Sequence, residues 1–131
     1  MKYLPVLILP LLVAGCSTTI TNLTPQLQTR KADNLYPVAV ALDSTQQTLL
    51  WETIRPRVVV DNTSYALQPT PFMTNRWEGL MPVPASEDTV RYQYQFDYDY
   101  NAMGGPKPAN LLSPQYTLRI VPQPESNNQS Q

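Results

Sequence analysis

The sequence predicts an all-β domain built as a sandwich of two sheets, with about five to seven strands. Fourteen prolines against four glycines leave little room for long helices, because proline lacks an N–H donor and clashes with the preceding helical turn. Eight tyrosines against two phenylalanines favour strands that have one solvated face. Residues 90–100 (VRYQYQFDYDY) alternate strictly between apolar or aromatic and polar side chains, which is the period of a half-buried strand.

The first predicted strand covers residues 36–43, where Val38, Val40 and Leu42 share one face. Residues 44–52 fit either a strand or one helical turn. The β-branched run in residues 53–62 predicts a second strand that ends in an Asp-Asn turn signal, and residues 64–68 then return as its hairpin partner.

After the long alternating strand, Gly104 and Gly105 lie inside NAMGGPKP, which predicts a hairpin loop. Residues 116–121 predict the last strand, with Tyr116, Leu118 and Ile120 facing inward. This pattern fits an immunoglobulin-like or transthyretin-like sandwich, with a small barrel as the alternative. A true antibody-type domain is excluded, because the chain has one cysteine and cannot form the Cys…Trp…Cys pattern.

The length of 131 residues suits one domain, and composition divides the chain into four parts. Residues 1–15 combine a positive Lys2, an apolar run and two small residues, as a secretory signal peptide does. Residues 16–32 are polar and Thr-rich, which predicts a tether that would hold the domain about 20 Å from a bilayer. As an alternative, Ile20, Leu23 and Leu27 belong to a first strand or a short helix. Residues 33–122 form the predicted sandwich, and residues 123–131 a disordered polar tail.

The stretch LVAGC at residues 12–16 resembles the lipobox of bacterial lipoproteins, in which an aliphatic residue and two small ones precede a cysteine. The resemblance covers about the first seventeen residues, and it implies diacylglyceryl transfer to the Cys16 thiol and cleavage before Cys16. Acyl chains on Cys16 would then hold the protein at the membrane, because two or three chains together bind firmly. Ser17, rather than an aspartate, follows Cys16, which implies the outer membrane under the sorting pattern of enterobacterial-type lipoproteins.

Composition also argues against several kinds of chemistry. The net charge is −1 and the longest basic block is Arg30-Lys31, so we expect no nucleic-acid partner. The chain has no histidine, and its one cysteine is the expected acylation site, so we expect no metal site, no cofactor and no catalytic residues.

The stretch most suggestive of binding is residues 68–87, where prolines bracket large apolar side chains and stiffen the chain. Two interpretations stay open for Trp77: it plugs the end of the sandwich, or it belongs to an interaction loop. The candidate interaction residues are Phe72, Met73, Arg76, Trp77, Leu80 and Met81.

We therefore expect a non-catalytic accessory lipoprotein that docks onto another envelope protein, for example in an envelope or secretion assembly. The alternative is a small glycan- or ligand-binding module that uses Trp77 and surface tyrosines as stacking platforms.

Overall fold

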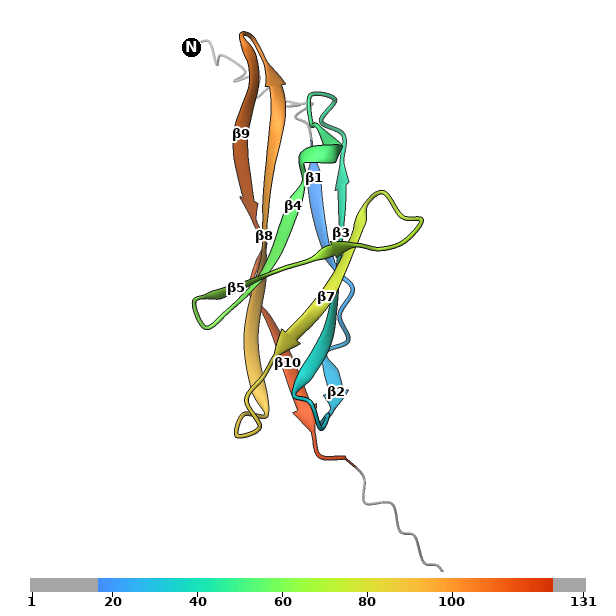
Figure 1. Ribbon diagram of the computed structural model, residues 1–131, viewed down its shortest axis with the longest axis vertical. Coiled ribbons are helices and arrows are strands. Elements are labelled where there is room, and N and C mark those ends of the chain that lie inside the picture. Colours follow the sequence, from blue (N-terminus) through green and yellow to red (C-terminus); the bar gives the residue numbers. More distant parts are fainter. Residues whose placement is uncertain (1–16, 124–131) are drawn as a thin grey trace, which may run out of the picture.

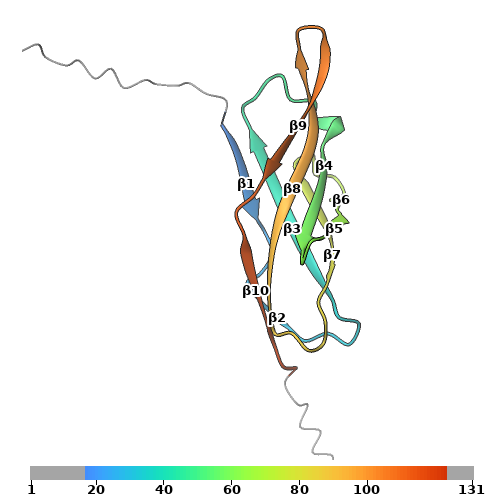
Figure 2. The ribbon, with the colours of Figure 1, turned by 90° about the vertical axis from the view of Figure 1, so that its left-hand side faces the viewer.

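The computed structural model describes residues 17–123, which form two packed β-sheets (Figures 1 and 2). The signal peptide, the lipobox with Cys16 and most of the predicted tail lie outside the described residues. The first sheet has the order β1-β3-β7-β6, and the second has the order β2-β10-β8-β4-β5 with β9 also paired to β8. The elements are β1 (Thr18–Asn22), β2 (Leu27–Thr29), β3 (Leu35–Ser44), the 3-10 turn η1 (Trp51–Thr53), β4 (Arg55–Val60), β5 (Thr63–Ala66), β6 (Gln68–Pro69), β7 (Arg76–Pro82), β8 (Thr89–Ala102), β9 (Gly105–Leu112) and β10 (Tyr116–Val121).

This strand order is that of the immunoglobulin-like sandwich, with β1, β3, β7 and β6 in the places of strands A, B, E and D. The all-β sandwich is therefore confirmed, and of the alternatives the immunoglobulin-like topology is the one present. The described residues hold ten strands rather than five to seven, because β2 and β6 are too short to give a sequence pattern and β1, β7 and β9 are poorly patterned. In the same residues the only helical element is η1, and no helix has the length and apolar character needed to span a bilayer.

The alternating stretches fold as predicted, because one face of each packs between the sheets. In β8 the side chains of Val90, Tyr92, Tyr94 and Phe96 are buried, and Leu118 and Ile120 of β10 lie in the same core. Residues 61 and 62 both have positive φ (49° and 64°), which makes the β4–β5 connection the two-residue hairpin turn that its Asp-Asn sequence predicts. Residue 44 ends β3, and residues 45–50 form no regular strand: Leu49 makes an isolated bridge to Tyr100, and η1 begins at Trp51.

The tether predicted for residues 16–32 is wrong in its described part, and the alternative of a first strand is correct. The five residues of β1 pair antiparallel with β3, and β2 crosses to the second sheet to pair parallel with β10. Ile20 packs partly buried against the core. Sequence composition did not reveal β1 because an edge strand with a solvated face needs few apolar residues.

A buried polar cluster fixes the crossing between β1 and β2. The Tyr94 hydroxyl donates to Asn22 Oδ1 (2.8 Å), and Asn22 Nδ2 donates to the Tyr92 hydroxyl (2.8 Å). The Thr24 hydroxyl lies 2.9 Å from that of Tyr94 and accepts the Ala39 N–H of β3 (3.0 Å). The chain therefore changes sheets without leaving these buried polar groups unpaired.

Candidate functional site

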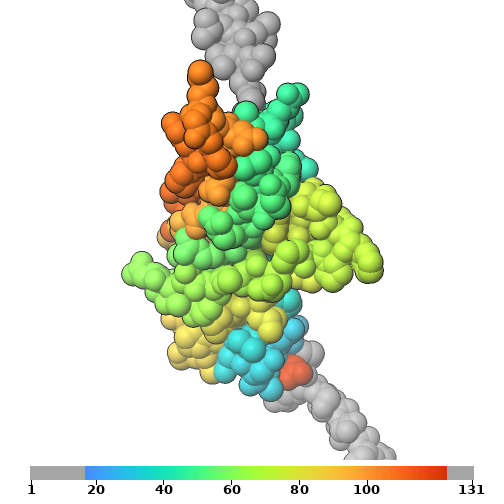
Figure 3. Space-filling view, turned by 45° about the horizontal axis from the view of Figure 1, so that its top comes forward, coloured from blue at the N-terminus to red at the C-terminus, as the bar shows by residue number. Residues whose placement is uncertain are grey.

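The loop between β6 and β7 projects from the body of the molecule (Figure 3), and the aromatic ring of Phe72 in this loop is fully exposed. The Met73 N–H donates to the Thr70 carbonyl (3.1 Å), with Pro71 at the second position of the turn and Phe72 at the third. The φ of Phe72 is 64°, so this is a type II turn, whose third position normally holds glycine. We call residues 70–73 the Phe72 turn.

A phenylalanine in this conformation costs folding free energy and recovers none through burial. A left-handed conformation costs a residue with a Cβ roughly 1–2 kcal/mol, and a bulky side chain there is a genuine outlier. The exposed ring of Phe72 makes no contribution to the core cluster that would offset this cost. Strained residues of this kind concentrate at binding and catalytic sites.

The base of the loop that carries the Phe72 turn is held firmly. The Thr70 N–H donates to the Arg76 carbonyl (2.9 Å), and the Leu42 N–H of β3 donates to the Asn75 carbonyl (3.0 Å). Asn75 also donates through its side chain to Asp43 (3.3 Å). A partner that binds Phe72 would therefore meet a largely pre-ordered loop, and the entropy lost on binding would be small.

The six candidate interaction residues differ in burial. Phe72, Met73, Arg76 and Leu80 are on the surface, whereas Trp77 and Met81 are buried and face the second sheet. The Trp77 ring packs edge-on against Phe96, with ring centroids 5.7 Å apart and an interplanar angle of 77°. Trp77 and Met81 as interaction residues are thus a wrong prediction. Of the two interpretations of Trp77, its burial is correct, but the ring packs in the core from strand β7 and does not plug the end of the sandwich from a connection.

The sequence did not predict a strand over residues 76–82, because Gly79 interrupts the alternation of apolar and polar side chains. Trp77, Gly79 and Met81 all face inward, and an alternating strand would need an apolar side chain at the middle position. A Cβ on Gly79 would lie 2.7 Å from the Cδ2 atom of Leu67, so any larger residue at this point would require the Leu67 side chain to move. The stretch is therefore a central strand of the first sheet rather than a loop.

Leu80 belongs to a second apolar surface, on the outer face of the first sheet. It is 54% exposed and pairs across the sheet with Pro37 of β3. Together with Leu23, Pro25 and Ala39 these residues line an open hollow of about 340 Å³. Arg76 lies four residues earlier on the same face, about 13 Å along the strand, so Leu80 is separate from the Phe72 turn.

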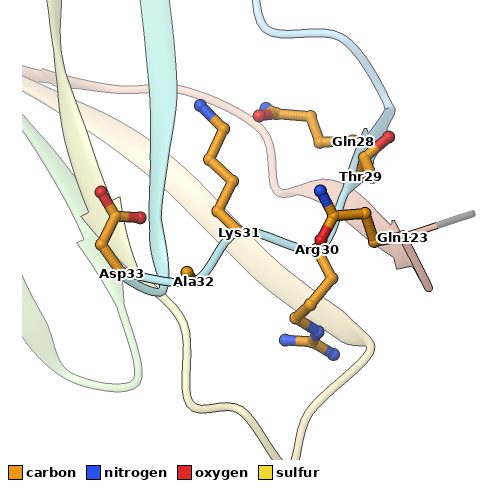
Figure 4. Close-up of a pocket in the computed structure, with 7 residues that line it drawn as sticks. All are labelled: Gln28, Thr29, Arg30, Lys31, Ala32, Asp33 and Gln123. Carbon is orange, nitrogen blue, oxygen red and sulfur yellow. The ribbon is translucent and has the colours of Figure 1, made fainter. Parts of the chain in front are cut away.

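A larger hollow, of about 660 Å³, lies at the opposite end of the sandwich from the β8–β9 turn, between the β2–β3 connection and the end of β10 (Figures 1 and 4). Its charged groups are Arg30, Lys31 and Asp33, and they do not converge on one point. The Arg30 guanidinium turns away and donates to the Glu87 carbonyl (2.6 Å). The arrangement is a polar, open surface and gives no paired acid and base.

The acidic side chains of the described residues do not gather into a metal-binding cluster. Within residues 17–123 no three His, Cys, Asp or Glu side chains come close enough to hold a metal ion. Asp97, on the solvated face of β8, forms an ion pair with Arg57 of β4 at 2.7 Å, with both side chains partly exposed.

No protein-family model matches this sequence, and no curated protein matches it either.

One exposed apolar residue was not predicted from the sequence. Met103, at the tip of the β8–β9 hairpin, is 98% exposed. The signal for it was the pair Gly104-Gly105, whose φ angles of 94° and 120° produce the turn and leave the preceding side chain in solvent.

Proposed function

We propose that this protein is an accessory lipoprotein of the bacterial cell envelope that binds another envelope protein through the Phe72 turn. Acyl chains on Cys16 hold it at the membrane, which is the outer membrane if the Ser17 sorting pattern applies. The observation that carries the proposal is Phe72 itself: a fully exposed aromatic ring on a strained, pre-ordered turn. Exposed aromatic and methionine side chains are enriched in protein interfaces, and Met73 adjoins Phe72.

Trp51 is 37% exposed, but the burial of Trp77 and of two β8 tyrosines favours a protein partner over a glycan. A glycan-binding module would stack sugars on exposed rings, yet Trp77, Tyr92 and Tyr94 are all at most 4% exposed. Phe72 stands on a projecting loop rather than in a concave site, which suits insertion into a pocket on a partner.

Replacing Phe72 with glycine tests the proposal, because it separates binding from folding. Glycine adopts positive φ without strain and no buried contact is lost, so the free energy of unfolding should stay level or rise by up to about 1 kcal/mol. Binding to the partner should weaken by about 2 kcal/mol or more, roughly 30-fold in Kd, if Phe72 is a hot spot. Cross-linking in intact membranes, followed by quantitative mass spectrometry, identifies the partner and measures the loss.

The control is Leu112→Ala, which removes another exposed apolar side chain (56%), from β9 of the other sheet. The control should keep the cross-linked partner. If Phe72→Gly keeps the partner at the wild-type level, the Phe72 turn is not the binding site.

A further inference from the structure

The first described residue is already fixed to the sandwich. The Ser17 N–H donates to Thr45 Oγ1 (2.9 Å), and the Ser17 carbonyl accepts the Thr45 N–H (3.0 Å). The Thr18 hydroxyl then meets that of Ser44 at 2.9 Å. Consecutive Cα atoms are 3.8 Å apart across a trans peptide, so hardly any free chain separates Cys16 from the folded domain.

The β8–β9 hairpin projects from the same end of the molecule (Figures 1 and 2). The segment that follows Thr45 joins the two: the Asn101 N–H of β8 donates to the Thr48 carbonyl (2.8 Å), and Leu49 bridges to Tyr100. The position of Ser17 relative to the hairpin is therefore set by direct hydrogen bonds through a short segment. The end of β10 lies at the other end of the molecule.

The tip of this hairpin has the chemistry of a membrane contact. Residues 101–106 (NAMGGP) carry no charge, and Met103 is almost completely exposed. Behind the tip, Tyr100 and Lys107 face each other across the two strands. Tyrosine and lysine are favoured at the level of lipid headgroups, where a ring or an alkyl chain lies in apolar surroundings and the polar end reaches water.

The length of the projecting tip also matches the thickness of the lipid headgroup layer. Met103 lies three residues beyond the bridged Tyr100, which is about 10 Å at strand spacing. The headgroup layer on each side of a bilayer is about 5–8 Å thick. The uncharged tip can therefore enter this layer while Lys107 stays near the phosphates.

We propose that the tip of the β8–β9 hairpin inserts between the lipid headgroups of the bilayer that holds Cys16, as a second contact that orients the domain. This inference rests on the proposed acylation of Cys16. A bilayer is the occupant we assign because the chain outside the structure joins the fold at this end. Met103 is also followed by two glycines, so the tip offers a protein partner no second large side chain beside it.

A fluorescent probe at the tip tests the contact in the acylated, full-length protein. Met103→Cys is labelled with an environment-sensitive dye, and the protein is reconstituted into phosphatidylethanolamine–phosphatidylglycerol vesicles that contain nitroxide-labelled lipid. Ser86→Cys is the matched control, since residue 86 is exposed in the β7–β8 connection at the opposite end. We expect a blue shift and lipid quenching at position 103, and an unchanged aqueous spectrum at position 86.

Flotation of the same vesicles separates the two proposals. Vesicles that float with the protein while the probe at position 103 stays aqueous would overturn the hairpin contact and leave the anchor intact. Quenching at position 86 instead of 103 would overturn the orientation. A blue shift at position 103 that needs added envelope protein and shows no lipid quenching would mean that the tip binds a protein, and the membrane contact would be refuted. Protein that fails to float and takes up no fatty-acid label would refute acylation, and with it both proposals.

Discussion

Tyr94 is the residue at which both sheets and the β1–β2 crossing meet. Its ring lies in the core, its hydroxyl donates to Asn22, and its backbone N–H donates to the Ser113 hydroxyl (2.8 Å). Burial raises the pKa of Tyr94 well above its ordinary value of 10.0, and burial likewise raises the pKa of Tyr92. Both phenols are therefore held neutral in the folded protein more strongly than in the unfolded chain.

These pKa shifts predict a loss of stability in alkali. The folded-state pKa of each phenol is raised above 10.0, so the unfolded chain releases protons first. The stabilisation is complete below that value and is lost progressively as the pH rises above it. The urea midpoint should fall between about pH 9 and pH 11, and the Tyr94→Phe variant should show a shallower fall. Equal slopes for wild type and variant would show that Tyr94 ionisation does not govern alkaline stability.

At the scale of elements, the junction between β9 and β10 lets one edge of β8 pair with two strands in succession. The pairing of β9 ends at Leu112 opposite Gln95, and that of β10 begins at Tyr116 opposite Tyr92, so the register shifts by one residue. Ser113 fills the gap: its N–H donates to the Tyr94 carbonyl (2.9 Å), and its hydroxyl accepts the Tyr94 N–H. The hydroxyl in turn donates to the Pro114 carbonyl (2.8 Å).

Replacing Ser113 with alanine should therefore destabilise the whole sandwich. The variant leaves the buried Tyr94 N–H without a partner, which costs about 1–3 kcal/mol. Chemical denaturation should show this loss, while Ser64→Ala at an exposed site on β5 should leave the midpoint within experimental error. A Ser113→Ala protein as stable as the wild type would mean that water or a backbone shift satisfies the N–H.

How far each strand could be predicted depended on how completely it is buried. The stretches that became β3, β8 and β10 have one face fully in the core, so their side chains must alternate. β9 escaped prediction because Pro106 and Pro108 are tolerated only at a sheet edge, where the proline nitrogen faces away from the neighbouring strand. Of the candidate site, Phe72 and Met73 could be named from residue type, but the strain at Phe72 could not, since Thr-Pro-Phe-Met gives no sign of positive φ.

At the scale of the whole molecule, the proposed acylation of Cys16 and the start of β1 at Thr18 together imply a fixed orientation of the domain on the membrane. Inserting twelve Gly/Ser residues between Cys16 and Ser17 should keep the acylation but remove this restraint, because such a linker spans about 20 Å. Fatty-acid labelling should be unchanged, and lipid quenching of a probe at position 103 should fall. A proline-free, rigid helical insert serves as a second spacer. Quenching that persists with both inserts would mean that the hairpin binds lipid without help from the anchor.

The pairing of β1 with β3 also determines how the protein responds to mechanical force. With the proposed anchor at Cys16, a pull directed along the axis of β1 would act at right angles to the hydrogen bonds to β3. All five residue pairs are then loaded together in shear, instead of opening one after another as they would if the strand were peeled sideways. If the proposed anchor and partner pull on the domain from opposite sides, β1 would therefore resist the load with all five of its pairs at once.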